Sequence, residues 1–216
     1  MTDAMRIHHG NVRRNPFTRS AATRANVAGA LRRGTHRRAG VATVWVILTV
    51  PAIFTMLVFV SDIANLWLAR IELGNALEAG ALAAAEEWAQ GSSTTQARTI
   101  AQDYAFANNV IGQPVSLGSN QDLAQGPNDN ASCTGDIVLG AVDVLTFTFS
   151  AGTAPGPPST RHFGVKTQKT VVVPSLWTSL FGFTPGPYEV TAHAIAMCPA
   201  TGTPAQLVHI NTFTCP

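Results

Sequence analysis

Charge is what this chain has least of. Charged residues make up 12% of the 216 residues, about half the share of an ordinary soluble domain. The 20 residues from Val41 to Val60 contain no Asp, Glu, Lys, Arg or His at all. A helix of this length spans about 30 Å, which is the thickness of the hydrocarbon core of a bilayer. The missing charges therefore exclude an ordinary soluble segment here and predict a transmembrane helix over residues 41–61.

Acidic residues are also nearly absent before this apolar run (Val41–Val60). Residues 1–40 hold nine arginines and one acid, Asp3, so their net charge is 9 − 1 = +8. Residues 62–216 hold five Lys or Arg and eleven acids, so their net charge is 5 − 11 = −6. Because the positive flank of a membrane helix stays in the cytoplasm, we expect a single-pass protein. Residues 1–40 form its cytoplasmic tail, and the region after Asp62 is exported.

The basic leader allows two other interpretations. A cleaved secretory signal has a shorter apolar stretch, of about 7–15 residues, and a small-residue cleavage site. Here the run is longer, and Ser61-Asp62-Ile63-Ala64-Asn65 follows it with no early Ala-x-Ala. Clustered arginines also mark nucleic-acid-binding arms, but this leader has one aromatic residue, Phe17, and no recognisable fold motif. We therefore favour a disordered tail that orients the helix and contacts anionic headgroups.

Motifs of enzymes and metal sites are missing too. The sequence has no Cys-x-x-Cys, His-x-x-x-His, Gly-x-Ser-x-Gly, P-loop or dinucleotide fingerprint, which are the patterns that carry those chemistries. Its one pair of adjacent carboxylates, Glu86 and Glu87, fits a solvated helix face. We therefore predict no catalytic residue, no metal ligand and no cofactor, and neither a nucleic acid nor a small-molecule partner.

Cysteine is scarce, with Cys133, Cys198 and Cys215 all placed after the apolar run. An oxidising compartment allows one disulfide among three cysteines and leaves one thiol over. A Cys198–Cys215 bond would close a short C-terminal loop, and pairing of Cys133 with either is equally allowed. The catalytic alternative is a cysteine nucleophile with His162, His193 or His209 as its base.

What the sequence does have is helical periodicity beyond the membrane. From Ile63 to Ala89 small and apolar residues recur at steps of three and four, which indicates one face of a helix. Such a small-residue face lets another helix approach closely. We expect it to pack against its own domain or a partner helix, through a small-residue stripe that consists of Ala76, Gly80, Ala81 and Ala84. At the start of this region, we interpret Asp62 as a charge that reaches headgroup water.

The rest of the exported region predicts helices first and strands afterwards. A second helix is expected at about Thr95–Asn108, capped by Thr94 or Thr95, with Ala97, Ile100, Ala101, Tyr104 and Ala105 on one face. Apolar, β-branched segments predict strands at Ile137–Phe149 (with a bulge or bend at Gly140), Gly164–Val173 and Tyr188–Met197. A short amphipathic helix is expected between the last two, over residues 174–182, with Pro174 in its first turn.

These elements predict an α+β protein with a largely antiparallel sheet. We divide it into a tail (1–40), a transmembrane helix (41–61), a helical Ala-rich stalk (62–111), and an exported β-rich domain with a C-terminal tail (112–216).

The stretch from Arg37 to Ala85 resembles the N-terminal region of the TadE/TadG-like proteins of tight-adherence (Flp) pilus systems. Their pattern has basic residues and a glycine, an apolar helix with a proline at mid-span, an aspartate, an arginine and an alanine run. The corresponding residues here are Arg37, Arg38, Gly40, Pro51, Asp62, Arg70 and residues 82–85. Glu78 stands where the family commonly has Asp. The ending, VKTQKTVVVPSLWTSLFGF and YEVTAHAIA, also resembles many TadG-like proteins, so the likeness covers most of residues 37–197.

Two departures from the family pattern indicate the branch. Processed pseudopilins of the TadE kind carry Glu at the fifth position after the cleavage-site glycine, and the fifth residue after Gly40 is Trp45. Longer TadG-like proteins contain a von Willebrand A domain with a D-x-S-x-S metal loop, and this sequence has no such motif. The resemblance therefore implies a TadG-like protein without that domain, uncleaved at Gly40.

The function implied by the resemblance is a membrane-anchored, non-enzymatic component of Flp pilus assembly or its secretion apparatus. It would sit in the bacterial inner membrane with its C-terminal domain periplasmic or extracellular. Its partners would be the membrane and other pilus-assembly or secretion proteins. Two alternatives stay open: a pilin-like subunit cleaved after Gly40, and an exported enzyme or sensor with an unrecognised site.

Overall fold

A computed structural model describes residues 39–119, 135–152, 160–182, 188–199 and 203–214. Residues 1–38 of the predicted basic tail, Cys133 and Cys215 lie outside these residues. Contacts divide the chain into two units, Met1–Ile53 and Phe54–Pro216. In the first unit the structure describes the beginning of helix α1, and the second unit contains the rest of that helix and all other elements.

The first element is one long helix, α1, from Ala39 to Ala89. It continues through Pro51 and includes both the apolar run and the predicted Ala-rich helix. Beyond its end, Gly91 has a φ of +91°, a backbone conformation that glycine adopts without strain. The predicted transmembrane and Ala-rich helices are thus parts of one continuous element.

The second helix, α2, runs from Thr94 to Phe106. Its N-cap is Ser93, whose Oγ accepts a hydrogen bond from the backbone N–H of Gln96 at 3.1 Å. Our prediction of Thr94 or Thr95 as the cap was therefore wrong by one or two positions. Three alanines of the predicted face, Ala97, Ala101 and Ala105, are buried, whereas Tyr104 is 54% exposed. The predicted face is therefore buried at its alanines and not at its tyrosine.

The strands form a hairpin and a six-stranded mixed sheet. The hairpin pairs β1 (Asn109–Val110) with β2 (Gln113–Pro114). The sheet has the order β7-β6-β5-β3-β4-β8, and all of its neighbours are antiparallel except β4 and β8. Its strands are β3 (Ile137–Asp143), β4 (Thr148–Ala151), β5 (Arg161–Val173), β6 (Tyr188–Cys198), β7 (Gln206–Leu207) and β8 (Thr212–Thr214). The α+β class is confirmed, and the predicted C-terminal tail contributes the two short edge strands β7 and β8.

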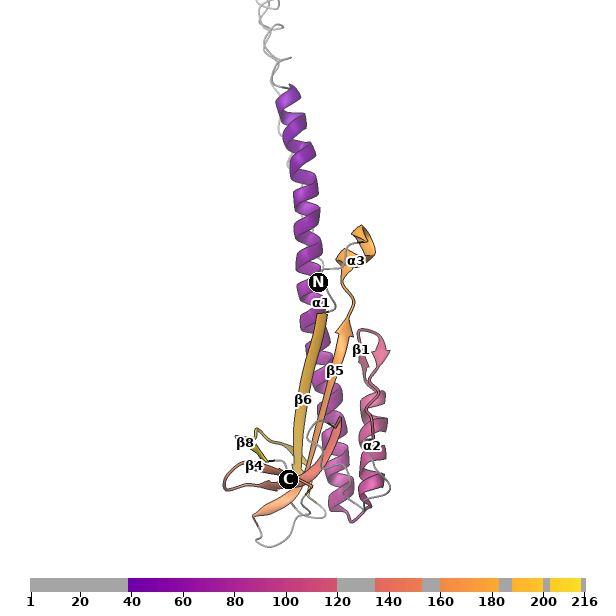
Figure 1. Cartoon of the computed structure of the whole chain (residues 1–216), viewed down its shortest axis with the longest axis vertical. Helices are drawn as coiled ribbons and strands as arrows, with labels where there is room; N and C mark the ends of the chain where they lie inside the picture. The colour runs from indigo at the N-terminus through magenta and orange to yellow at the C-terminus, as the bar shows by residue number, and fades with distance from the viewer. Residues whose placement is uncertain (1–38, 120–134, 153–159, 183–187, 200–202, 215–216) are drawn as a thin grey trace, which may run out of the picture. The chain divides into compact units, whose positions relative to one another are not determined.

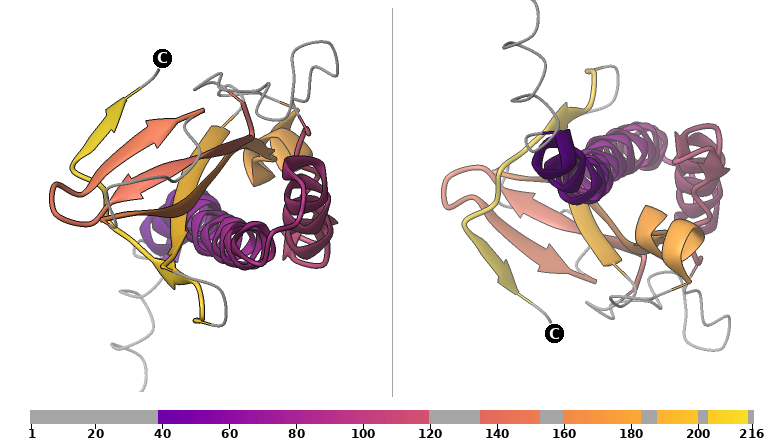
Figure 2. Two further views of the ribbon diagram at one scale, coloured as in Figure 1. Left: turned by 90° about the horizontal axis from the view of Figure 1, so that it is seen from below. Right: turned by 90° about the horizontal axis from the view of Figure 1, so that it is seen from above.

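The two faces of the sheet belong to different cores. One face packs on α1 and α2, which lie side by side against it (Figure 2), through residues such as Leu77 of α1, Leu139 of β3 and Ala194 of β6. The other face packs on Phe149 of β4 and on the segment that leads to β8. Residues 62–111, the predicted helical Ala-rich stalk, belong to the same unit as the sheet.

The single strand that we predicted at Ile137–Phe149 is two strands with a turn between them. The side chain of Asp143 accepts a hydrogen bond from the backbone N–H of Leu145 at 2.9 Å, and Phe147 has a φ of +51°. The predicted bulge at Gly140 was also wrong, because Gly140 pairs regularly with Ala151 and Gly164. A Cβ at Gly140 would lie 2.9 Å from the Phe149 ring, so the glycine makes room for that ring.

Helix α3 (Leu176–Phe181) follows β5 in the chain. Ser175 caps it by accepting a hydrogen bond from the N–H of Trp177 at 3.1 Å, and Gly182 ends it with a φ of +65°. Pro174 therefore precedes the cap, and our prediction that it lies in the first turn was wrong. Figure 1 shows α3 at the end of β5 that lies farthest from β4 and β8.

Candidate functional site

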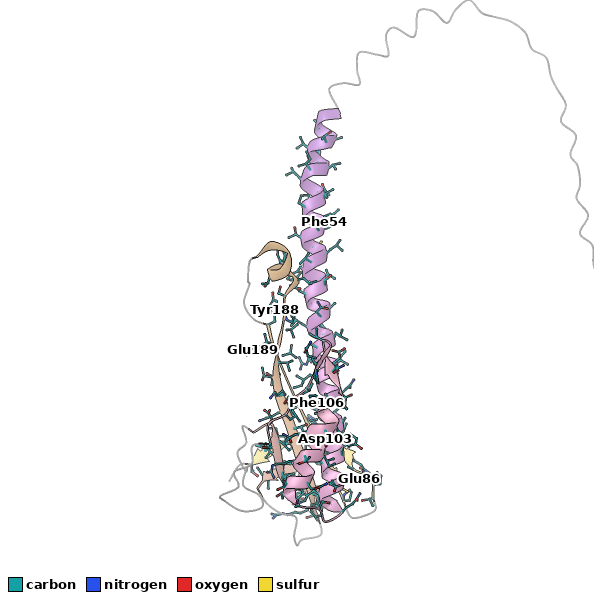
Figure 3. The ribbon with its side chains drawn as sticks, turned by 90° about the vertical axis from the view of Figure 1, so that its right-hand side faces the viewer. Phe54, Glu86, Asp103, Phe106, Tyr188 and Glu189 are labelled. Atoms are coloured by element: carbon teal, nitrogen blue, oxygen red, sulfur yellow. The ribbon has the colours of Figure 1, made fainter. Side chains whose placement is uncertain are left out.

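The most unusual surface of the protein is the apolar run of α1. Its large apolar side chains are 44–71% exposed, apart from Val58, and α1 is the one helix among the described residues that is long and apolar enough to cross a membrane. Figure 3 shows side chains projecting from α1 on both sides of the helix near Phe54. Soluble monomers rarely expose contiguous apolar patches larger than a few hundred Å². This exposure suggests a membrane anchor.

Directly after the run, Asp62 joins α1 to α3. Its Oδ2 accepts a hydrogen bond from the Ser175 hydroxyl at 2.6 Å, and its Oδ1 accepts one from the backbone N–H of Leu176 at 2.8 Å. The residue is only 4% exposed. Our interpretation of Asp62 as a charge that reaches headgroup water was therefore wrong: the carboxylate is buried against the start of α3.

A second contact fixes the direction of β5 along α1. The hydroxyl of Thr167 donates to the carbonyl oxygen of Leu77 at 2.8 Å, and both groups are buried. From Asp62 to Leu77 the helix rises about 22 Å, and from Thr167 to Ser175 a strand covers about 26 Å. The two contacts therefore make β5 run back along α1 and return the chain to the Asp62 end of this unit.

The small-residue stripe lies in the core of the second unit. Ala76, Gly80, Ala81 and Ala84 are all buried. A Cβ at Gly80 would lie 2.8 Å from the carbonyl oxygen of Ala101 and 3.6 Å from the Cβ of Ala105, so α2 approaches α1 at this glycine. Of the two possibilities that the sequence left open, the structure describes packing against the chain's own elements. Packing against a helix of another protein remains a prediction.

A strained turn is attached to the same helix. The hairpin β1–β2 turns at Ile111 and Gly112, which both have positive φ values, +49° and +73°. Such a turn is costly for a β-branched residue. The Glu72 carboxylate of α1 accepts a hydrogen bond from the N–H of Ile111 at 2.7 Å, and this contact holds the turn against the helix. No sequence signal pointed to this role of Glu72.

Two grooves lie along β6, one beside α1 and one beside Glu78 and residues 207–210. The larger, about 590 Å³, is lined by Leu66, Trp67, Arg70, Glu189, Val190 and Thr191. The smaller, about 310 Å³, is lined by residues that include Glu78, His193 and His209. Among the described strands, β7 pairs with β6 only at Ala196 and Met197, so most of this edge of β6 has no strand beside it. Figure 3 shows Tyr188 and Glu189 at the α3 end of the edge.

Two of the candidate catalytic residues, His193 and His209, line the smaller groove together, and Cys198 is not among its lining residues. Cys198 is buried in the core between sheet and helices, with its Sγ 3.3 Å from the carbonyl oxygen of Thr203. His193 is five positions earlier on β6 and is exposed. Since residues an odd number apart on a strand face opposite sides, it points away from the side of Cys198. His162 contacts the carbonyl oxygen of Pro199 at 3.0 Å through its Nδ1. In the part of the chain that the structure describes, no three His, Cys, Asp or Glu residues are placed to hold a metal ion.

One lysine lies in an unusual environment on the other face of the sheet. The Nζ of Lys166 is 4.1 Å from the centre of the Phe213 ring, in the range of a cation–π contact. Burial lowers the pKa of Lys166 from its ordinary value of 10.5, because desolvation penalises the charged form.

Comparison with known proteins gives one match. Residues 40–89 match the family model Tad, described as "Putative Flp pilus-assembly TadE/G-like". The match covers α1 from Gly40 to its end, which is 50 of 216 residues, and does not include α2 or the sheet. No curated protein and no solved structure matches the chain. The chain therefore carries a TadE/G-like segment that coincides with its exposed apolar helix and with the Asp62 attachment.

Proposed function

We propose that this protein is a membrane-anchored, non-enzymatic component of Flp pilus assembly or of the associated secretion apparatus. The observation that carries the proposal is a coincidence on one element: the TadE/G-like match and the exposed apolar run both lie on α1. A helix that is solvated by lipid along its first part and packed on a sheet along its second part suits an anchor with an attached domain.

The topology of the proposal follows from charge. With residues 1–40 at +8 and residues 62–216 at −6, the basic side stays in the cytoplasm. Residues 41–61 then span the bacterial inner membrane, and the unit with the sheet lies in the periplasm or outside the cell. Its partners are the membrane and other pilus-assembly or secretion proteins. The absence of a D-x-S-x-S motif from the sequence supports a TadG-like protein without a von Willebrand A domain.

Deletion of the gene in its host tests this function. We expect the deletion strain to lose surface Flp pili while the major pilin still accumulates in the cell. The full chain should restore the pili, and a Val50→Arg variant that disturbs the anchor should not. Normal pili on the deletion strain would contradict the proposal.

A second candidate is a pilin-like subunit cleaved after Gly40. It is favoured by the position of this glycine, since the family match starts at residue 40 and cleavage there would leave almost all of α1 intact. Mass spectrometry of the membrane-extracted protein, co-produced with a prepilin peptidase, separates the two candidates. Loss of residues 1–40 supports the pilin-like subunit, and an intact Arg-rich N-terminus supports the uncleaved anchor.

A further inference from the structure

Helix α3 lies beside α1 close to the point where the apolar run ends. Asp62 lies two residues beyond Val60, about 3 Å further along the helix. Because its carboxylate is 2.8 Å from the N–H of Leu176, the start of α3 lies within a few ångströms of the same level. The headgroup layer on each side of a bilayer is about 5–8 Å thick. If α1 spans the membrane as proposed above, α3 falls inside this layer.

The composition around α3 suits such a position. No charged residue occurs between Lys169 and Glu189. Helix α3 itself reads Leu-Trp-Thr-Ser-Leu-Phe, and its Trp177 is half-buried while Pro174 and Thr178 are exposed. Trp is enriched at the boundary between headgroups and hydrocarbon because its ring is apolar and its N–H is polar. Moving an uncharged segment of this composition from water to the lipid interface costs little free energy.

Helix α3 is attached to α1 by hydrogen bonds in addition to its own N-cap. Ser175 already caps the helix through the N–H of Trp177, and Asp62 adds the N–H of Leu176 and the Ser175 hydroxyl. The Thr167–Leu77 hydrogen bond keeps β5 in register with α1 farther along the helix. Together the two contacts fix the position of α3 along the axis of α1, relative to the end of the apolar run.

We propose that α3 is a second membrane contact of this protein, held by Asp62 at the outer headgroup boundary of the same bilayer that α1 spans. The inference rests on the proposed membrane anchor. A single helix leaves its attached unit free to rotate about the helix axis, and a second contact at one side stops this rotation. The two grooves along β6 then face a fixed direction along the membrane surface.

Fluorescence quenching by lipids brominated near the top of their acyl chains tests the proposal. The full chain is reconstituted into phosphatidylcholine–phosphatidylglycerol vesicles as three variants, each with one tryptophan kept (Trp45, Trp88 or Trp177) and the other three changed to Phe. Trp177 should lose emission to an extent comparable with Trp45. Trp88 should keep its emission, because it lies about 39 Å beyond Asp62 along the helix.

The outcomes separate this inference from the proposed anchor. Quenched Trp45 with unquenched Trp177 overturns the inference and leaves the anchor, whereas an unquenched Trp45 overturns the anchor itself. If a triple variant does not fold, the four-tryptophan chain is compared with Trp177→Phe, which should lose part of the quenchable emission.

The role of Asp62 is tested in the Trp177 variant by adding Asp62→Ala, which should decrease the quenching of Trp177. Glu72→Gln, which changes the other carboxylate of α1 that binds a distant backbone N–H, should leave the quenching unchanged. Equal quenching with and without Asp62→Ala would contradict the proposed role of that residue.

Discussion

The two parts of helix α1 differ in the size of their side chains and in what surrounds them. The apolar run has large residues that are exposed, while residues 69–89 include many alanines that are buried against α2 and the sheet. Both parts are uninterrupted α-helix. Composition therefore does not decide whether a helix forms here. It bears on what surrounds the helix. Small residues admit a close neighbour, whereas large apolar residues on all sides are typical of a helix that is buried in protein or spans a membrane, and we propose the membrane for the apolar run.

We expect the largest effect when a charged side chain is introduced into the apolar run. Val50→Arg places a charge near the middle of the apolar run, which costs about 2.5–3.5 kcal/mol for insertion into a membrane. We expect less protein in the alkali-resistant membrane fraction. Leu145→Arg is the matched control, because Leu145 is 75% exposed in the turn between β3 and β4, and it should leave this fraction unchanged. Equal loss for both variants would contradict a lipid environment for the apolar run.

We expect the second-largest effect at Asp62, near the junction between the two parts of α1. Asp62→Ala removes the acceptor of two hydrogen bonds, and bonds to charged groups contribute about 1.5–3 kcal/mol each. Hydrogen exchange of the purified full chain in detergent should show faster exchange of the Leu176 amide. The amide of Ile111, held by Glu72, provides the internal control. Unchanged exchange at Leu176 would mean that Asp62 does not hold α3.

Within the protein-packed part, two glycines of α1 should behave in opposite ways. Gly80→Ala puts a Cβ 2.8 Å from a backbone oxygen of α2, and overpacking of this kind costs about 1–3 kcal/mol. At Gly74 a Cβ meets nothing within 4 Å, so Gly74→Ala should stabilise the helix by up to about 1 kcal/mol. Thermal unfolding of the two variants measures this contrast. A similar effect of both changes would show that α2 does not approach α1 at Gly80.

The smallest expected effect is a pH dependence on the far face of the sheet. Because burial lowers the pKa of Lys166 in the folded protein, the unfolded chain binds a proton more readily than the folded one. Stability therefore increases as the pH rises from neutral through the lowered pKa towards 10.5, and levels off above that value. Lys166→Met removes this contribution. The difference in unfolding temperature between the two proteins should change with pH in this direction, and a constant difference would contradict it.

The parts of the fold that depend on local patterns were predictable. The periodicity of small residues indicated the helix to Ala89 and the alanine face of α2, and β-branched runs indicated the three long strand regions. The turn at 144–147 was missed because Val144, Leu145, Thr146 and Phe147 contain none of the usual turn residues. The local signal that was overlooked is Asp143 directly before them, whose side chain accepts a hydrogen bond from the N–H of Leu145, because Asp commonly begins such a turn.

The attachment of Asp62 could not be predicted for a different reason. Its partner Ser175 is 113 residues away in sequence, and nothing in the sequence near Asp62 distinguishes a solvated carboxylate from a buried one. The family pattern marked Asp62 as a recurring residue without indicating its partner. The contact between Thr167 and Leu77 could not be predicted for the same reason, because the two residues are 90 positions apart in the sequence.

The central claim is that α1 anchors the protein with the sheet on the outer side of the membrane. Two reporters fused after Pro216 test it most directly: alkaline phosphatase, which is active only in the periplasm, and green fluorescent protein, which stays dark when it is exported unfolded. The proposed topology predicts an active phosphatase fusion and a dark fluorescent-protein fusion. An inactive phosphatase fusion together with a fluorescent second fusion would contradict it.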